Sequence, residues 1–319
     1  MRLFKRGNHS ICERKFHKKE EALAEVTEKR KLVIGIVSSL VMIAIWSGFT
    51  VFSRLGVKTD LTPLDLVTLR FVLVGVIFTP VAYHWWPRHL TFFKAMLLAA
   101  TGPAIIYCFF AYQGLSYAPA AYAGVFLNSM MPIFAVILGF AFFGERLGPR
   151  ALTGVGLVLL GGLFLGFFDV DSVGEDAWIG ALCFMVSSGV LSTYVVFARR
   201  WGLSPKEALV IISVPNMIWL VPMWLSGLPT NMADAAWGSI IFQMLFQGLG
   251  PGLAAVIAYA LMIEYLGATP TAALSACVPS TATLLAIPVL GEWPSMYQWL
   301  GIAIVSVGLV FVLLLRRKT

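Results

Sequence analysis

Charged side chains are scarce in this sequence. Only 12% of its 319 residues are Asp, Glu, Lys or Arg, whereas ordinary soluble domains carry about 25%. Hydrophobic residues make up 59%, and the mean hydropathy is +0.85. This much apolar surface must face something other than water, and lipid is the simplest answer. The composition therefore excludes an ordinary soluble domain.

Cysteine and histidine are also few, and neither forms the pattern of a site. The cysteines have no paired spacing and three of them lie inside apolar runs, which argues against a disulfide framework and a zinc site. All histidines lie outside the apolar runs. We therefore expect no metal and no cofactor. The residues concerned are Cys12, Cys108, Cys183, Cys277, His9, His17, His84 and His89.

Ten apolar stretches qualify, or nearly qualify, as transmembrane helices, since a hydrocarbon core about 30 Å thick needs about 20 apolar residues per helix. Continuous runs such as "VLLGGLFLGFF" exclude the alternating pattern of a transmembrane β-barrel. The sequence therefore predicts an all-α polytopic membrane protein with ten transmembrane helices. The predicted spans are 33–52, 64–83, 95–113, 121–143, 151–168, 178–198, 208–225, 239–263, 271–290 and 297–315.

Lysine and arginine placement sets the predicted orientation. With the N-terminus inside, 20 of the 23 basic residues fall on the cytoplasmic side, Arg54 and Lys58 fall on the outer side, and Arg70 lies within a span. We therefore predict a multi-pass protein of the inner membrane with both termini in the cytoplasm. Residues 1–32 form a basic cytoplasmic tail, either unstructured or with a short surface helix, and lack the early apolar segment of a secretory signal. The net charge of +7 reflects this topology, so no nucleic-acid partner is expected.

The two halves of the chain are related. Residues 111–161 align without gaps to 258–308 with 12 identities in 51 positions. Each half holds five predicted spans, so the second half enters the membrane from the opposite side. The sequence thus predicts two inverted repeats, 33–168 and 178–315, an arrangement typical of alternating-access transporters. The shared residues include Ala111/Ala258, Tyr112/Tyr259, Pro132/Pro279, Gly144/Gly291, Glu145/Glu292, Gly154/Gly301 and Gly161/Gly308.

Longer segments of both halves resemble one known family. The first half contains "LNSMMPIFAVILGFAFFGERLGPRALTGVGLVLLGG" and the second "LSACVPSTATLLAIPVLGEWPSMYQWLGIAIVSVG". With Trp46 in "AIWSGF" and Arg70 in "VTLRFV", these segments are similar to EamA-type transporters of the drug/metabolite transporter superfamily, over about 33–315. The resemblance implies ten helices in two halves and transport of amino acids, metabolites, drugs or sugar phosphates.

The expected function is that of a secondary transporter, an exporter or exchanger, rather than an enzyme. Its partners would be the lipid bilayer and a small organic substrate, such as an amino acid or a related amphipathic compound. Proton-coupled pumps commonly carry an intramembrane carboxylate, but Asp65 and Glu264 come closest here and both lie near span ends. We therefore expect facilitated export, exchange or coupling through the substrate's own charge. The alternatives are a membrane-embedded enzyme, such as a lipid-linked transferase, and a non-transporting membrane partner or sensor.

Arg70 is the only charged residue predicted well inside a span. It follows Thr62 by eight residues, which places it about 12 Å deep at about 1.5 Å per residue. An intramembrane arginine is costly and usually faces a cavity or a partner. It could anchor a substrate carboxylate or phosphate. Alternatively, it extends toward the outer headgroups or pairs with Asp65 or with helix-end carbonyl groups.

Prolines interrupt corresponding helices in the two halves, and interrupted helices are the best sequence indication of a transporter site. Polar and aromatic residues near the same depth are candidates for lining a substrate cavity, although they could instead form hydrogen bonds that only join helices. Three further tyrosines lie nearer helix ends and are predicted at the membrane interface. The predicted breaks are at Pro103, Pro132, Pro251 and Pro279, the cavity candidates are Trp46, Arg70, Tyr107, Asn128, Gln243, Gln247 and Ser275, and the interfacial tyrosines are Tyr112, Tyr194 and Tyr259.

The repeated Gly-Glu pairs, Gly144-Glu145 and Gly291-Glu292, are predicted to be turns. Glycine allows the backbone to leave a helix with positive φ, and the glutamate can accept hydrogen bonds from the amides that open the next helix. The predicted topology puts the two pairs on opposite sides of the membrane. They therefore cannot share one catalytic site, and no catalytic residues are predicted.

Overall fold

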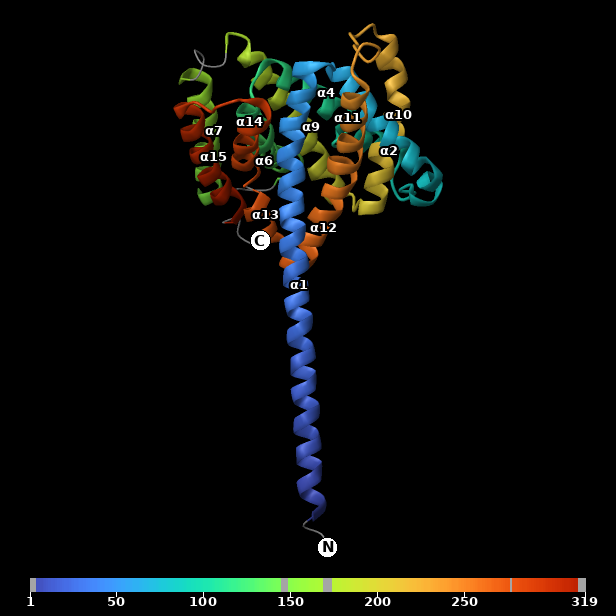
Figure 1. Ribbon diagram of the computed structural model, residues 1–319, viewed down its shortest axis with the longest axis vertical. Coiled ribbons are helices and arrows are strands. Elements are labelled where there is room, and N and C mark those ends of the chain that lie inside the picture. Colours follow the sequence, from blue (N-terminus) through green and yellow to red (C-terminus); the bar gives the residue numbers. More distant parts are fainter. Residues whose placement is uncertain (1–3, 145–148, 169–173, 276, 315–319) are drawn as a thin grey trace.

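The computed structural model describes residues 4–144, 149–168, 174–275 and 277–314 (Figure 1). These residues form helices and contain no strand, which confirms the predicted all-α class for this part of the chain. The elements are α1 (Phe4–Thr59), α2 (Pro63–Trp85), α3 (Phe92–Thr101), α4 (Ile105–Tyr117), α5 (Ala120–Tyr122), the π-helix η1 (Ala123–Ser129), α6 (Met130–Phe143), α7 (Pro149–Phe168), α9 (Ala177–Arg200), α10 (Pro205–Leu225), α11 (Trp237–Leu249), the π-helix η2 (Gly250–Ala254), α12 (Ala255–Leu266), α13 (Ala268–Ser275), α14 (Val278–Leu290) and α15 (Met296–Leu314).

Helix α1 is longer than the sequence predicted. It runs without a break from Phe4 to Thr59, and its N-terminal part projects from the bundle (Figure 1). The interpretation of the basic tail as unstructured, or as a separate short helix, is therefore wrong. The segment "KKEEALAEVTEKRK" consists mainly of strong helix formers and contains no glycine or proline. Nothing in it ends a helix before the first apolar span begins.

Seven helical segments are long and apolar enough to cross a membrane, counted over the described residues. They cover seven of the ten predicted spans. The other three predicted spans fall on helices of the described chain as well: 151–168 on α7, 271–290 on α13 and α14, and 297–315 on α15. The seven segments are Lys29–Thr59, Pro63–Trp85, Phe92–Tyr117, Ala120–Phe143, Ala177–Arg200, Pro205–Leu225 and Trp237–Leu266.

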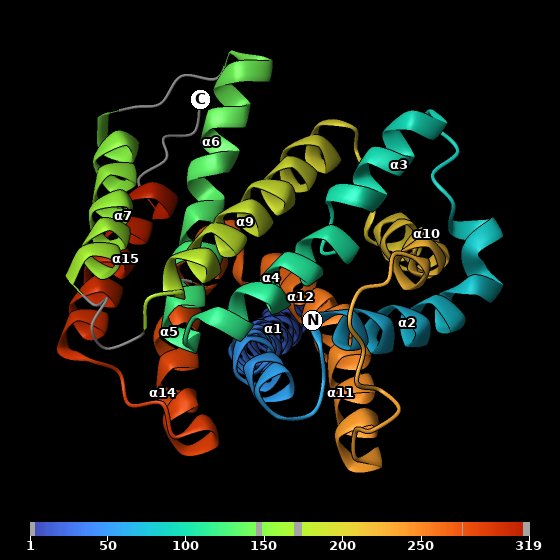
Figure 2. The same cartoon turned by 90° about the horizontal axis from the view of Figure 1, so that it is seen from above.

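Helix packing repeats between the two halves. Helix α1 packs against α12 and α14, and its counterpart α9 packs against α4 and α6, which are the counterparts of α12 and α14. The remaining large contacts join α2 to α10 and α7 to α15, each helix meeting its own counterpart. Seen from above, these two pairs lie at opposite sides of the central helices α1, α4 and α12 (Figure 2). These contacts between the two halves are thus matched by contacts between the corresponding helices.

The crossing of α7 and α15 depends on glycines that the repeat shares. A Cβ atom added to Gly161 would lie 3.1 Å from the carbonyl oxygen of Gly301, and one added to Gly308 would lie 2.9 Å from that of Gly154. Gly161 corresponds to Gly308 in the repeat, and Gly154 to Gly301. Small residues let membrane helices approach closely, and here each half supplies the same pair.

Candidate functional site

Two of the predicted breaks interrupt the third and eighth spans at corresponding places. Helix α3 ends at Thr101 and α4 begins at Ile105, with Pro103 between them. In the second half Pro251 lies within the π-helix η2. Both arrangements remove regular helical hydrogen bonds near the middle of the bundle, and π-helical turns frequently occur at functional sites.

The other two predicted prolines also lie beside irregular segments. Pro132 is in the first turn of α6, directly after the π-helix η1. Pro279 is in the first turn of α14, where α13 has ended at Ser275. Each half of the molecule therefore contains two interrupted helices. The breaks in the third and eighth spans adjoin α4 and α12, which both pack against α1.

Asn216 of α10 stabilises the break between α3 and α4. Its Oδ1 accepts a hydrogen bond from the amide of Ile105 at 2.9 Å, and its Nδ2 donates to the carbonyl oxygens of Ala99 at 3.0 Å and Ile212 at 2.8 Å. The side chain is fully buried. Sequence reasoning missed this residue because one asparagine in an apolar helix forms no pattern. It satisfies backbone groups that a regular helix would have paired internally.

Replacing Asn216 with leucine is expected to destabilise the protein by about 2–4 kcal/mol, because the amide of Ile105 and the carbonyl of Ala99 lose their buried partner. Thermal unfolding of purified protein in detergent measures the change, and the apparent Tm should fall by at least about 5 °C. The matched control is Asn231→Leu, since the Asn231 side chain is exposed. Equal midpoints for both variants would contradict this role.

Arg70 lies in the interior of the bundle with 3% of its surface exposed. Its guanidinium is 5.7 Å from the centre of the Phe49 ring and 5.6 Å from that of Phe71. Nη2 is 3.5 Å from the carbonyl oxygen of Pro103, which the break between α3 and α4 leaves accessible. Nη1 has no hydrogen-bond partner in the described part of the chain. The arginine therefore does not extend toward the headgroups.

Asp65 is not the partner of Arg70. Its buried carboxylate accepts hydrogen bonds from the amides of Thr62 at 2.9 Å and Asn231 at 3.0 Å, and from the hydroxyl of Thr230. It caps α2 and fixes the link between α10 and α11 to that helix end. The alternative in which Arg70 pairs with Asp65 is therefore wrong, because two backbone amides and the Thr230 hydroxyl occupy the carboxylate.

Two predicted glutamines join helices in the core beside Arg70. Nε2 of Gln247 donates to Oγ of Ser53 at 2.9 Å and to Oε1 of Gln243 at 3.1 Å. Nε2 of Gln243 donates to the carbonyl oxygen of Phe52 at 2.7 Å. Tyr112 donates its hydroxyl proton to Oε1 of Gln247 at 3.2 Å. The network links α1, α4 and α11 through donors that are largely satisfied within the protein.

Tyr112 corrects a second prediction. It is fully buried and lies beside Phe49, at 5.8 Å between ring centres, rather than at the membrane interface. Tyr107 is also buried, and its ring stacks on that of Phe49 with the ring centres 6.4 Å apart. Arg70, Tyr107, Gln243 and Gln247 are thus brought together around Phe49, Ser53 and Tyr112, and we call these seven residues the Arg70 cluster.

The remaining candidates lie elsewhere. Trp46 stacks against Tyr259 with ring centres 6.5 Å apart, beside a separate group of buried residues that includes Met262. Ser275 donates its hydroxyl to the carbonyl oxygen of Thr271 at 2.9 Å, within its own helix. Asn128 is half-buried in η1. Among the described residues, no hydrogen bond joins these side chains to the Arg70 cluster.

A cavity of about 280 Å³ lies where α2 and α4 meet the link between α10 and α11. It is close to the lower limit of ligand pockets, which span about 300–1,000 Å³. The cavity lies at the start of α2, and Arg70 follows the lining residue Leu64 by six residues along this helix. Its lining residues are Pro63, Leu64, Phe109, Gln113, Leu228 and Pro229.

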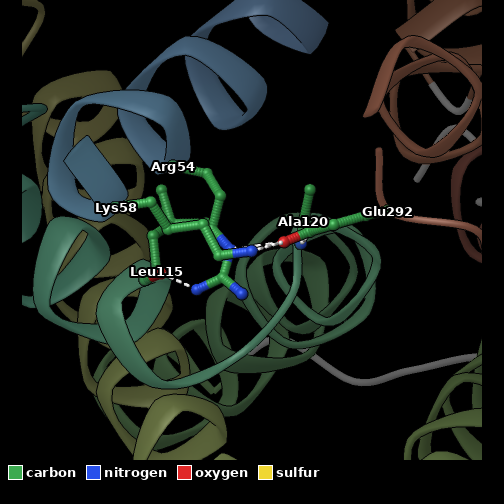
Figure 3. Close-up of polar contacts among 5 residues, drawn as sticks. All are labelled: Arg54, Lys58, Leu115, Ala120 and Glu292. Atoms are coloured by element: carbon green, nitrogen blue, oxygen red, sulfur yellow. Dashed lines mark hydrogen bonds and ion pairs between the residues drawn. The ribbon is translucent and has the colours of Figure 1, made fainter. Parts of the chain in front are cut away.

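A second polar cluster closes one end of the bundle, opposite the end from which α1 projects (Figures 1 and 3). Oε1 of Glu292 lies 2.8 Å from Nε of Arg54 and 2.9 Å from Nζ of Lys58, and Oε2 accepts from the amide of Ala120 at 3.1 Å. Arg54 also donates to the carbonyl oxygen of Leu115. This Glu292 cluster (Arg54, Lys58, Ala120 and Glu292) ties α1 and the start of α5 to the link between α14 and α15.

Glu292 therefore does not cap the helix that follows it. That role belongs to Ser295, whose hydroxyl accepts a hydrogen bond from the amide of Gln298 at 3.1 Å. The prediction was wrong because the side chain of Glu292 turns away from α15 and toward two cations on α1. Burial would raise the pKa of Glu292, but Arg54, Lys58 and the amide of Ala120 together hold the pKa below its usual value.

The glycines of the two pairs end their helices with left-handed backbone conformations. Gly144 follows α6 with φ of 65°, and Gly291 follows α14 with φ of 67°. Residues that carry a side chain rarely adopt this backbone conformation, whereas glycine adopts it at no steric cost. Glu145, the other predicted cap, lies outside the described residues.

Apolar helices of membrane-spanning length, interrupted in both halves around a buried polar cluster, are the architecture of a membrane transporter. The chain matches the EamA-like transporter family over residues 33–167 and again over 178–314. It belongs to this family. The two matches confirm the resemblance seen in the sequence, and each covers one of the predicted halves.

Individual relatives agree with this assignment. An uncharacterized transporter, YwfM, of Bacillus subtilis (strain 168) is 26% identical over 220 residues, which cover 66% of this chain and 72% of that protein. A protein of Streptantibioticus cattleyicolor named "Probable terminal-alkyne amino-acid exporter" is 24% identical over 209 residues, 65% of this chain and 67% of that protein. A solved crystal structure is similar in fold, with a TM-score of 0.60 and 19% identity over 89% of this chain and 97% of that one.

Proposed function

We propose that this protein is a secondary transporter, an exporter or exchanger, that moves a small organic metabolite across the inner membrane by alternating access. The observation that carries this proposal is the reciprocal packing of two halves around helices that are interrupted in both. If the halves are inverted, each can adopt the conformation of the other. Inward-open and outward-open states then have similar energies, which transport in both directions requires.

The substrate we propose is an amino acid or a related amphipathic compound. The Arg70 cluster combines a cation and hydroxyl groups with aromatic rings, and such a mixture suits a molecule with both a charged and an apolar part. The name of the Streptantibioticus relative supports the same class of substrate. We further propose ten spans with both termini in the cytoplasm, which would place the Glu292 cluster on the outer side.

The mechanism we propose does not require a proton. Asp65, one of the two carboxylates nearest to a span interior, is occupied by the backbone and hydroxyl donors of its own helix end and the neighbouring link. The other, Glu264, is exposed. Neither is placed to take up and release a proton beside Arg70, so exchange driven by substrate gradients is expected.

Counterflow in proteoliposomes tests the proposal. Vesicles containing the purified protein and preloaded with leucine, phenylalanine or methionine should take up the labelled amino acid, whereas vesicles without protein should not. With the substrate's charge held constant, an imposed pH gradient should leave the flux unchanged. Absence of exchange across a wide panel of amino acids and related metabolites would overturn the transport proposal, and flux that follows the pH gradient would overturn the proton-independent mechanism.

A further inference from the structure

We infer that Arg70 binds the single negative charge of the substrate, and that this charge is a carboxylate. This inference rests on the proposed function and specifies the site within it. Three observations carry it: the guanidinium is almost completely buried, its Nη1 has no partner in the described part of the chain, and no described carboxylate forms an ion pair with it.

A buried cation needs an anion. Removing an ion from water costs several kcal/mol, and this cost is repaid only when an opposite charge and hydrogen bonds satisfy it. Around Arg70 the protein supplies two ring faces and the carbonyl oxygen of Pro103 at 3.5 Å, the outer limit of a hydrogen bond. The other polar side chains facing it are Tyr107, Cys108 and Tyr112, which are neutral. The charge compensation is therefore incomplete without a further molecule.

One positive charge matches one negative charge. A phosphate monoester carries nearly two at neutral pH, and the second would stay uncompensated among Phe49, Phe71 and Tyr107 in a region of low dielectric constant. A carboxylate carries one charge and fits the guanidinium fork through parallel hydrogen bonds. The free Nη1 supplies a donor for such a contact.

Nearby donors also favour the smaller anion. Both Nε2 protons of Gln247 are engaged, one with Ser53 and one with Gln243. Nε2 of Gln243 is bonded to the backbone of Phe52. The amides therefore have little left to offer the three terminal oxygens of a phosphate. Tyr112 donates its hydroxyl proton to Oε1 of Gln247, so this proton is not available to an anion either.

The experiment compares ligands that differ only in the charged group. Purified full-length protein in detergent is titrated with phenylalanine and leucine, with their carboxamides, and with their aminophosphonate analogues, and thermal unfolding is followed. Ligands that bind the folded state raise the midpoint according to concentration and affinity. We expect at least one of the two amino acids to stabilise the wild-type protein. Its carboxamide and its aminophosphonate should each bind at least about 100-fold more weakly.

Variants of Arg70 locate the effect. Arg70→Gln should weaken binding of the amino acid about 100-fold while leaving the weak binding of the carboxamide unchanged, because only the charged contact is lost. Arg70→Lys keeps the charge but loses the fork, so an intermediate affinity is expected. If Arg70→Gln does not fold, the comparison of amino acid with carboxamide in the wild-type protein still decides.

Three results would overturn the inference: no stabilisation by either amino acid, equal stabilisation by amino acid and carboxamide, or unchanged amino-acid affinity in Arg70→Gln. Tighter binding of the aminophosphonate would overturn the choice of a single charge. The outcomes are separable from those of the transport proposal. Arg70-dependent binding without any counterflow would refute transport alone, whereas counterflow that is intact in Arg70→Gln would refute the carboxylate site alone.

Discussion

Replacing Gly308 with leucine is expected to prevent stable folding of the bundle. A Cβ atom at this position would lie 2.9 Å from the carbonyl oxygen of Gly154 and 2.9 Å from the backbone nitrogen of Val158. Backbone atoms of α7 cannot move aside locally, so α15 would have to separate from α7 along the crossing. Overpacking a core costs about 1–3 kcal/mol and more where the backbone must shift. We expect the apparent Tm to fall by at least about 10 °C, or the monodisperse peak in size-exclusion chromatography to disappear.

Gly156→Leu is the matched control, because it lies on the same pair of helices and a Cβ there meets nothing within 4 Å. Gly161→Leu should behave like Gly308→Leu, since its Cβ would approach Gly301 and Val305 in the reciprocal way. Combining Gly161→Leu with Gly308→Leu should cost less than the sum of the two, because one separation of α7 from α15 relieves both clashes. If Gly308→Leu unfolds at the wild-type temperature, the close crossing does not exist.

The repeat explains how far the fold could be predicted. Counting apolar residues located the helices, and the shared glycines and prolines related the two halves. An offset between equivalent residues does not say which residues touch, however. That Gly161 meets Gly301, rather than its own counterpart Gly308, follows only from how α7 and α15 cross.

The site was predictable in part for a similar reason. Gln243 and Gln247 are four residues apart, so the sequence placed them on one helix face, but their partner Ser53 lies 194 residues from Gln247. Long-range contacts of this kind leave no local pattern. The composition of the basic segment indicated a helix, but not that this helix continues without a break into the first apolar span.

Arg54 and Lys58 were exceptions to the predicted topology, because they are the two basic residues assigned to the outer side. Their pairing with Glu292 gives a physical reason for their position. The distribution of basic residues along the sequence showed that Arg54 and Lys58 were unusual. It could not identify their partner, because Glu292 lies more than 230 residues further along the chain. In the second half Gly291 thus forms the predicted turn, whereas Glu292 binds two cations instead of capping the next helix.

Replacing Glu292 with glutamine is expected to open the end of the bundle that the Glu292 cluster closes. Arg54, whose side chain is 9% exposed, would keep the carbonyl oxygen of Leu115 but lose its counter-charge. Removing one partner of a buried ion pair costs about 3–5 kcal/mol. If alternating access separates α1 from the link between α14 and α15, part of this energy shifts the equilibrium toward the open state. A shift of about 1.4–2.7 kcal/mol raises the ratio of open to closed protein about 10-fold to 100-fold.

Cysteine labelling measures this shift. In protein whose native cysteines are replaced, a cysteine introduced at Ala121, which is buried and lines the same small cavity as Glu292, should react slowly with a membrane-impermeant maleimide. Glu292→Gln should raise the labelling rate about 10-fold or more, whereas Glu175→Gln, which alters an exposed carboxylate, should not. Lys58→Met should have a smaller effect than Arg54→Met, because the Lys58 side chain is 45% exposed and its ion pair is screened by water.

The pH dependence of labelling separates an ionic contact from simple packing. Because the cluster holds the pKa of Glu292 below its usual value, the closed form gains stability that is fully present above the usual glutamate pKa of about 4.3 and is lost as the pH falls through the lowered pKa. Because only the thiolate reacts, each labelling rate is divided by that of a fully exposed cysteine at the same pH. This relative rate should stay low for the wild-type protein at neutral pH and rise only below about pH 4.3, whereas in Glu292→Gln it should be high at every pH. A variant with a lower Tm but the wild-type labelling rate would show that the cluster stabilises the fold without controlling access, because only a change in the open population exposes the residue at position 121.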